Sequence, residues 1–269
     1  ITYIFEHGGA KLVFADTQFL SVVEDAIAKL EGPRPTLIEV PDEFAGFPAT
    51  GKYETYESFL KTGNVHFDWI MPQDEWESLA LNYTSGTTGK PKGVVYHHRG
   101  AYLMTMGTIV IWRMTLNPVF MAIVPLFHCN GWNHTWMMPV LGGSLVCCRD
   151  ITSQAIYDAI ADEGVQYFGG APIVLNMIVN TNDTERRGFD HTVEVFTAGA
   201  PPAPATLLKI EKLGFNVTQV YGLTETYGHV TECYWENQKW SELEGEQRAA
   251  IKARPVSYTH LTLPTTQVV

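Results

Sequence analysis

The sequence of 269 residues has few cysteines, few basic residues and no long apolar run, and each shortage excludes a class of protein. Its four cysteines include the neighbours Cys147 and Cys148 but no Cys-x-x-Cys pair. This argues against a disulfide framework or a zinc ribbon and predicts a reducing, cytoplasmic location. The longest apolar stretches, such as Val119–Phe127, have about half the length that a bilayer span needs, so no membrane span is expected.

Basic residues are also fewer than acidic residues. Lys and Arg total 18 against 29 Asp and Glu, and the net charge of −11 disfavours binding to nucleic acid or to an anionic membrane. No carboxylate occurs between Ser78 and Arg149, although cations and histidines do. Burial of 101–148 explains part of this, because carboxylates are rarely buried unpaired. It does not explain the polar, cationic stretch Tyr83–Arg99, which suits a site for an anion.

Apolar periodicity predicts an α/β fold with mostly parallel sheets and flanking helices. The segments Lys11–Ala15 and Thr36–Val40 are expected strands on either side of a helix at Ser21–Leu30, and Pro41–Gln73 is an expected surface excursion with a small helix. Further strands are expected at 79–83, 93–96, 119–126, 144–148, 165–169, 193–198 and 216–221. Helices are expected between them at 99–112, 135–141, 151–163, 171–180 and 204–213, and a polar amphipathic helix at 240–252.

The segment Leu81–Gly93 (LNYTSGTTGKPKG) has the composition of a phosphate-binding loop. Its three glycines let the backbone turn with positive φ and bring N–H groups close to an anion. Its lysines supply the countercharge, and its hydroxyls supply neutral donors: Thr84, Ser85, Thr87 and Thr88. It is not a Walker A loop, because only two residues separate Gly86 from the Gly89-Lys90 pair and a proline follows.

This segment resembles the signature loop of the adenylate-forming (AMP-binding) enzymes, which include acyl-CoA synthetases, luciferases and peptide-synthetase adenylation domains. Two later segments, Ala198–Pro202 (AGAPP) and Gln219–Thr226 (QVYGLTET), resemble the family's next motifs in the expected order. The segments Val95–Gly100 and Leu126–Trp132 are most similar to short- and medium-chain acyl-CoA synthetases. The resemblance covers residues 1 to about 254.

The resemblance implies a role for each motif. Thr84, Lys92 and the loop between them, comprising Ser85, Gly86, Thr87, Thr88 and Gly89, would bind the β- and γ-phosphates of ATP. Gly199, Ala200 and Pro201 would shape the adenine slot, with Tyr221 stacked on the base and Gly222 beside it. Thr224 would bind the α-phosphate. Glu225, together with Thr84, would hold Mg²⁺, a cation that prefers carboxylates and substrate phosphates.

Two further features bear on the acid. In the family a histidine equivalent to His128 lies near the acyl and phosphate sites, although a lone histidine of this kind is as easily structural. The family carries more apolar residues than Asn133-His134-Thr135 after Gly131-Trp132, so the acyl specificity is left open. Six methionines between 104 and 138 are either core residues or the lining of an adaptable acyl pocket.

The resemblance therefore implies ATP-dependent activation of a carboxylic (fatty) acid to an acyl-adenylate and then, with coenzyme A, to an acyl-CoA. The alternatives are a luciferase or peptide-synthetase type of acceptor, or a catalytically inactive ATP-binding fragment. The family's ribose motif and C-terminal lid domain have no counterpart after Glu236. Residues 1–254 are therefore expected to be a partial N-terminal adenylation domain, and 255–269 resembles an in-frame translation of a sequencing-library adapter. The sequence makes no prediction of oligomeric state.

Overall fold

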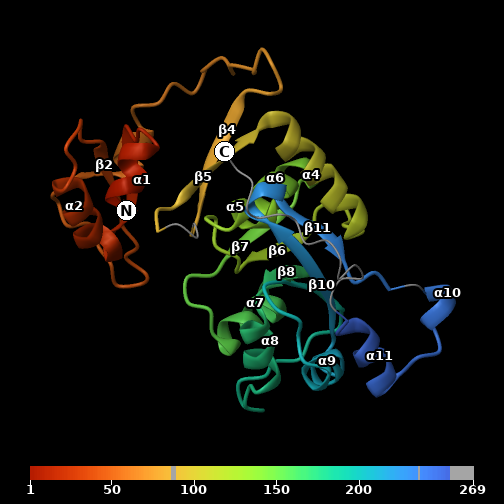
Figure 1. Ribbon diagram of the computed structural model, residues 1–269. Coiled ribbons are helices and arrows are strands. Elements are labelled where there is room, and N and C mark those ends of the chain that lie inside the picture. The colour runs from red at the N-terminus through yellow and green to blue at the C-terminus, as the bar shows by residue number, and fades with distance from the viewer. Residues whose placement is uncertain (86–88, 236, 255–269) are drawn as a thin grey trace. The chain divides into compact units, whose positions relative to one another are not determined.

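The computed structural model describes residues 1–85, 89–235 and 237–254 (Figure 1). These residues form two compact units. The first comprises Ile1–Asp74 and Tyr83–Gly93, and the second comprises Glu75–Asn82 and the described residues from Val94 onward. A two-stranded sheet of β4 (Ser78–Thr84) and β5 (Lys92–His97) carries residues of both units.

The first unit is a small parallel sheet with the order β1-β2-β3. Its core contains Ala15, Leu20 and Leu37, and Glu39 is buried in the central strand, where it accepts hydrogen bonds from Thr50 and Thr17. The strand-helix-strand prediction is confirmed, but β3 lies in the segment expected to be a surface excursion. Its elements are α1 (Thr2–His7), β1 (Leu12–Asp16), η1 (Thr17–Phe19), α2 (Leu20–Ala28), β2 (Thr36–Val40), β3 (Glu54–Thr55) and α3 (Tyr56–Leu60).

The second unit is built on a six-stranded sheet with the order β11-β10-β9-β8-β6-β7. All neighbours are parallel except β10 and β11, which are antiparallel. The strands are β6 (Val119–Ala122), β7 (Ser144–Cys147), β8 (Tyr167–Gly170), β9 (Val193–Thr197), β10 (Phe215–Leu223) and β11 (Gly228–Glu232). The mostly parallel α/β fold predicted from the sequence is confirmed.

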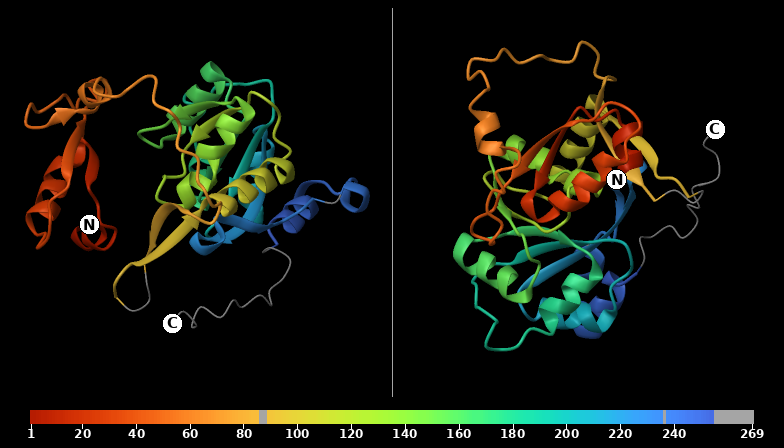
Figure 2. Two further views of the ribbon diagram at one scale, coloured as in Figure 1. Left: turned by 90° about the horizontal axis from the view of Figure 1, so that it is seen from above. Right: turned by 90° about the vertical axis from the view of Figure 1, so that its left-hand side faces the viewer.

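Helices cover both faces of this sheet, as the views in Figures 1 and 2 show. Alternate residues of a strand point to opposite faces, so Phe168 lies in the core beneath α7, α8, α9 and α11, whereas its neighbour Tyr167 lies in the core beneath α4 and α6. The helical elements are α4 (His98–Ile111), α5 (Cys129–Trp132), α6 (His134–Leu141), α7 (Ser153–Glu163), α8 (Pro172–Val179), α9 (Pro204–Glu211), η2 (Thr224–Thr226), α10 (Asn237–Trp240) and α11 (Gly245–Lys252). None of the described helices combines the length and hydrophobicity needed to cross a membrane.

Two sequence predictions about these elements were wrong in extent, and the strand β11 was missed. The strand expected at 119–126 ends at Ala122, and Pro125 beyond it has no N–H to donate to a ladder. The helix expected at 240–252 begins only at Gly245, whose φ of 54° separates α11 from α10. The antiparallel strand β11 was not expected at all.

Candidate active site

The phosphate-loop segment joins β4 to β5. Thr84 ends β4, Ser85 follows it on the surface, and Lys92 begins β5 with an exposed side chain. Gly89 has a φ of 94°, a conformation that suits glycine and a close backbone approach to an anion. The residues predicted to contact phosphate at 86–88 lie outside the described residues, so their role remains a prediction.

Both sides of this loop contact α1 of the first unit. The Tyr83 hydroxyl lies 2.9 Å from Nδ1 of His7, and burial raises the pKa of Tyr83. The Lys90 ammonium lies 5.6 Å from the centre of the Tyr3 ring, within the range of a cation–π interaction. Lys90 and Lys92 are both exposed, and the phosphate-binding role of Lys92 stays a prediction.

The predicted nucleotide residues of the second unit lie at the carboxyl ends of neighbouring strands. Gly199, Ala200 and Pro201 follow the end of β9 and are exposed, and Gly199 has a φ of 94°. Tyr221 lies near the end of β10, which pairs with β9 in parallel, and its side chain is 40% exposed. In parallel α/β sheets a ligand binds at this edge, so the structure brings the two predicted adenine motifs together.

Gly222 permits the sharp turn that follows β10. The pairing of β10 with β11 shifts register between Tyr221 and Gly222. A Cβ atom on Gly222 would lie 1.7 Å from the Gly228 carbonyl oxygen, so only glycine allows the two backbones to approach this closely. The contribution of Gly222 is therefore to the shape of the turn, alongside its predicted place at the nucleotide.

The turn that follows presents Thr224 and Glu225. Both lie in the short helix η2, and the Glu225 side chain is exposed while Thr224 is half-buried. The Thr226 hydroxyl accepts a hydrogen bond from the Leu223 N–H at 2.9 Å and donates to the Gly228 carbonyl at 2.8 Å. An exposed carboxylate on a fixed turn, next to a hydroxyl, is a suitable donor set for Mg²⁺ bound to a phosphate substrate.

His128 precedes a turn of unusual handedness. Its side chain is exposed and lies against Phe127, with 4.5 Å between ring centroids. All residues from Cys129 to Asn133 have positive φ, between 46° and 68°, so the backbone follows a left-handed turn. The Cys129 thiol lies 3.6 Å from the Leu223 carbonyl, and the Asn130 side chain accepts a hydrogen bond from Asn82 at 3.0 Å. Cys129, which follows His128, thus contacts the residue that precedes the Thr224–Glu225 turn.

Two polar residues flagged as departures from the family lie in the core. Asn133 and His134 are at most 1% exposed, and their side-chain polar atoms make no hydrogen bond within the described part of the chain. Burial lowers the pKa of His134, although the backbone of Gly131 opposes this effect. Four of the six clustered methionines are buried among other apolar side chains, as expected for core residues rather than for the lining of an acyl pocket: Met114, Met121, Met137 and Met138. Met104 and Met106 are more exposed.

Sequence reasoning missed two residues of this site. The hydroxyl of Tyr96, a fully buried residue of β5, donates to the Thr224 carbonyl at 2.6 Å. Tyr227 stacks on Tyr96, with 4.0 Å between centroids. The available signal was that Tyr96 lies within the recognised segment Val95–Gly100 and that Tyr227 directly follows Gln219–Thr226. The contact itself joins residues 128 positions apart.

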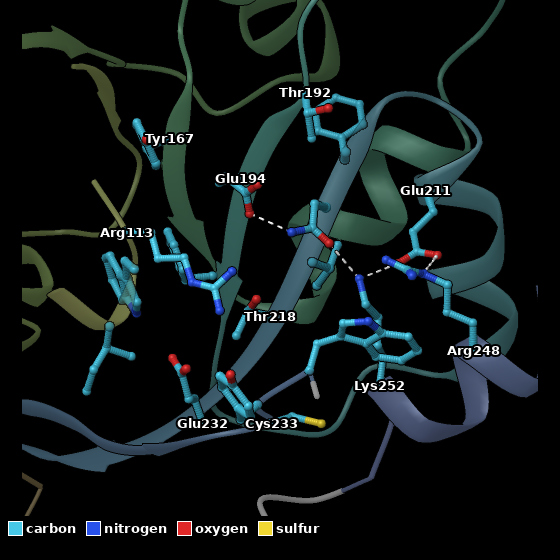
Figure 3. Close-up of a pocket in the computed structure, with 18 of the residues that line it drawn as sticks. Arg113, Tyr167, Thr192, Glu194, Glu211, Thr218, Glu232, Cys233, Arg248 and Lys252 are labelled. Carbon is cyan, nitrogen blue, oxygen red and sulfur yellow. Dashed lines mark hydrogen bonds and ion pairs between the residues drawn. The ribbon is translucent and has the colours of Figure 1, made fainter. Parts of the chain in front are cut away.

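A cavity of about 660 Å³ lies at the other end of the same strands, at the amino ends of β9 and β10 (Figure 3). Its wall contains the Glu211–Lys252 ion pair, and Lys252 also donates to Asn216 at 2.6 Å. Burial lowers the pKa of Lys252, although Glu211 opposes this effect. None of the predicted nucleotide residues lines this cavity, so it is distinct from the candidate active site.

Comparison with known proteins agrees with these motifs. The acetate–CoA ligase CCL3 of Humulus lupulus is 41% identical over 267 residues, covering 94% of this chain and 47% of the relative. The peroxisomal acetate/butyrate–CoA ligase AAE7 of Arabidopsis thaliana is 40% identical over 273 residues, covering 96% and 48%. The chain thus spans about half the length of the curated relatives it matches.

Solved structures share the fold. The inhibitor-bound N-terminal domain of FACL13 from Mycobacterium tuberculosis has a TM-score of 0.70 at 21% identity and covers 89% of this chain and 57% of that structure. A luciferase-like enzyme from the mealworm Zophobas morio has a TM-score of 0.73 at 18% identity and covers 89% and 54%. The profile of the AMP-binding enzymes matches residues 1–257, and the chain belongs to the AMP-binding enzyme family.

Proposed function

We propose that the protein is an acyl-CoA synthetase, which activates a carboxylic acid with ATP and transfers the acyl group to coenzyme A. In the first half-reaction the acid carboxylate attacks the α-phosphate of ATP, giving an acyl-adenylate and pyrophosphate. In the second the coenzyme A thiolate attacks the acyl carbon, and AMP leaves. The observation that carries this proposal is the meeting of the Gly199–Pro201 and Tyr221–Glu225 segments at one sheet edge in a chain of the AMP-binding family.

The residues supply positioning and neutralisation of charge, which is the main requirement of phosphoryl-type chemistry. Tyr221, with its exposed ring, offers a stacking surface to adenine beside Gly199–Pro201. Thr224 offers a hydroxyl to the α-phosphate. Thr84, Lys92 and the loop residues between them hold the β- and γ-phosphates, and Lys92 stabilises the departing pyrophosphate.

Glu225 is the proposed protein ligand for Mg²⁺, with Thr84 as a second oxygen donor. Its exposed carboxylate suits a cation that keeps several waters and is held chiefly by substrate phosphates. When bound, the ion neutralises charge on the phosphate oxygens. The chain's own contribution is the turn that holds this carboxylate next to Thr224.

The acid is proposed to be short. The relatives at about 40% identity include ligases named for acetate, for acetate and butyrate, and for 2-methylpropanoate. The Trp132 ring packs where a side chain at Gly169 would lie, 2.9 Å from the Cβ position, and fills space beside β8. The exposed His128 is proposed to contact the acid and the phosphate.

Residues 1–254 are proposed to be part of the N-terminal adenylation domain of a longer protein that also has a C-terminal lid domain. The chain's coverage of about half of each relative supports this. The segment 255–269, proposed to derive from a sequencing adapter, lies outside the described residues. By itself the chain of residues 1–269 is proposed to bind ATP without converting an acid to its acyl-adenylate.

Pyrophosphate release with a panel of acids tests the activity. We expect the longer protein to release pyrophosphate with acetate, butyrate or 2-methylpropanoate, and to form a thioester when coenzyme A is added. We expect the chain of residues 1–269 neither to release pyrophosphate nor to form a thioester. Thioester formation excludes a luciferase or peptide-synthetase acceptor, whereas a longer protein that turns over none of the acids would refute the enzyme proposal.

A cytoplasmic, reducing location is also proposed. All four cysteines are free in the structure, including the adjacent Cys147 and Cys148. A fluorescent fusion of the longer gene tests this, and an organellar signal would contradict it.

A further inference from the structure

Two successive backbone carbonyls of the Thr224–Glu225 turn are contacted by side chains from distant parts of the chain. The Thr224 carbonyl accepts the Tyr96 hydroxyl at 2.6 Å and also the Tyr227 N–H at 3.1 Å. The preceding carbonyl, of Leu223, is contacted by the Cys129 thiol at 3.6 Å. The peptide units that carry the turn are therefore restrained from β5 on one side and from the left-handed turn on the other.

Tyr227 completes the contact between β5 and the turn. Its ring stacks on Tyr96 with an interplanar angle of 22°, and its hydroxyl accepts the His97 N–H at 2.9 Å. A Cβ atom on Gly100 would lie 2.4 Å from the Tyr227 ring, so the ring occupies space that the glycine leaves open. Tyr227 itself has a φ of 62°, and these contacts offset the cost of that conformation.

The Tyr96 hydroxyl is not needed to satisfy an otherwise unpaired carbonyl. The Tyr227 N–H already donates to the Thr224 oxygen, so the second donor adds a restraint on the direction of the peptide. Phenylalanine would fill the same apolar space without the cost of burying a hydroxyl. Burial raises the pKa of Tyr96, so the hydroxyl keeps its proton and remains a donor over the whole working pH range.

We infer that Tyr96 is a positioning residue for adenylation, which acts by fixing the backbone of Thr224 and, through it, the Glu225 carboxylate. This inference rests on the proposed function. Tyr96 does not contact ATP in this scheme.

The Tyr96→Phe variant of the longer protein tests the inference in ATP–pyrophosphate exchange. We expect kcat to fall about 10- to 100-fold, because small displacements of reacting groups have effects of this size, with the KM for the acid within about two-fold of wild type. Tyr157→Phe is the matched control, because Tyr157 is equally buried but packs on Phe189 and Phe215. We expect this control to keep wild-type kcat.

Hydrogen exchange of the Tyr227 amide gives a readout that does not depend on activity, because this amide shares the Thr224 carbonyl with Tyr96. We expect exchange about 5-fold faster in Tyr96→Phe than in Tyr157→Phe, the factor that a hydrogen bond of about 1 kcal/mol corresponds to. If Tyr96→Phe does not fold, Tyr227→Phe removes the bond to His97 instead and is also expected to lower kcat.

An inactive wild-type protein would refute the proposed function. An active wild type with unchanged kcat in Tyr96→Phe would refute the inference alone.

Discussion

Replacing Gly222 by alanine tests the geometry of the turn after β10 most directly. The added methyl carbon would lie 1.7 Å from the Gly228 carbonyl oxygen, 2.4 Å from its carbon and 2.6 Å from the His229 Cα. Carbon and oxygen atoms normally approach to about 3.3 Å, so β11 must move by about 1.5 Å or lose its pairing with β10. All three atoms belong to backbone, and no side-chain rotation relieves the overlap.

Overpacking that forces the backbone to shift costs about 1–3 kcal/mol and occasionally more, and we expect Gly222→Ala to lose at least about 3 kcal/mol of unfolding free energy. The measurement is denaturant unfolding followed by tryptophan fluorescence. Gly107→Ala in α4 is the matched control, because no atom lies within 4 Å of its Cβ position, and it should gain about 1 kcal/mol from helix propensity. Equal midpoints for Gly222→Ala and wild type would refute the reasoning.

Three further predictions concern charge. Burial lowers the pKa of His229 to about 4 from 6.5, so between these pH values the unfolded chain binds a proton that the folded chain does not. The free energy of unfolding should therefore fall by up to about 3 kcal/mol as the pH drops from 6.5 to 4. In urea titrations at several pH values, His229→Gln should weaken this pH dependence. Glu211→Ala should cost about 3 kcal/mol, because it leaves the buried Lys252 with Asn216 as its remaining partner and also removes the partner of Arg248. Adding Lys252→Met should restore the part due to Lys252, and a double variant no more stable than Glu211→Ala would contradict the Glu211–Lys252 pairing. Glu225→Gln should raise the Mg²⁺ concentration required for pyrophosphate release about 10-fold or more. Thermal stability should not change, because the Glu225 side chain is exposed. A wild-type Mg²⁺ titration in this variant would refute the proposal that Glu225 binds the ion.

Local pattern was sufficient for most of the second unit's parallel strands. The apolar run in β6 identifies a strand buried on both faces, the alternation of Val193, Glu194 and Val195 identifies β9 as a strand, and the structure confirms both strands. The apolar pattern did not predict where a strand ends when that end depends on the hydrogen-bond partners of the strand. The apolar run continues to Phe127, but the strand pairs only as far as Ala122. Strand β11 was missed because it pairs with β10 only after the turn at Thr224–Tyr227 reverses the chain, and no apolar pattern in the sequence signals that turn.

The candidate site divides in the same way. Glycines, hydroxyls and the Tyr221–Glu225 motif are contiguous in sequence and could be read directly. The contacts that hold the motif could not, because the partners of Leu223 and Thr224 are Cys129 and Tyr96, far away in the chain. Residues whose role is to restrain a backbone carbonyl leave no pattern of their own, and only the fold identifies them.

The left-handed turn at Cys129–Asn133 has a consequence for chirality. For Cys129 and Trp132 an L configuration costs about 1–2 kcal/mol in this conformation, whereas Asn130 and Asn133 tolerate it better. A D-amino acid has the mirror-image preference and favours the φ of 56° found at Trp132. Segment 129–133 is therefore a place where a mirror-image residue, introduced by chemical ligation, would match the native backbone better than the residue that the ribosome supplies.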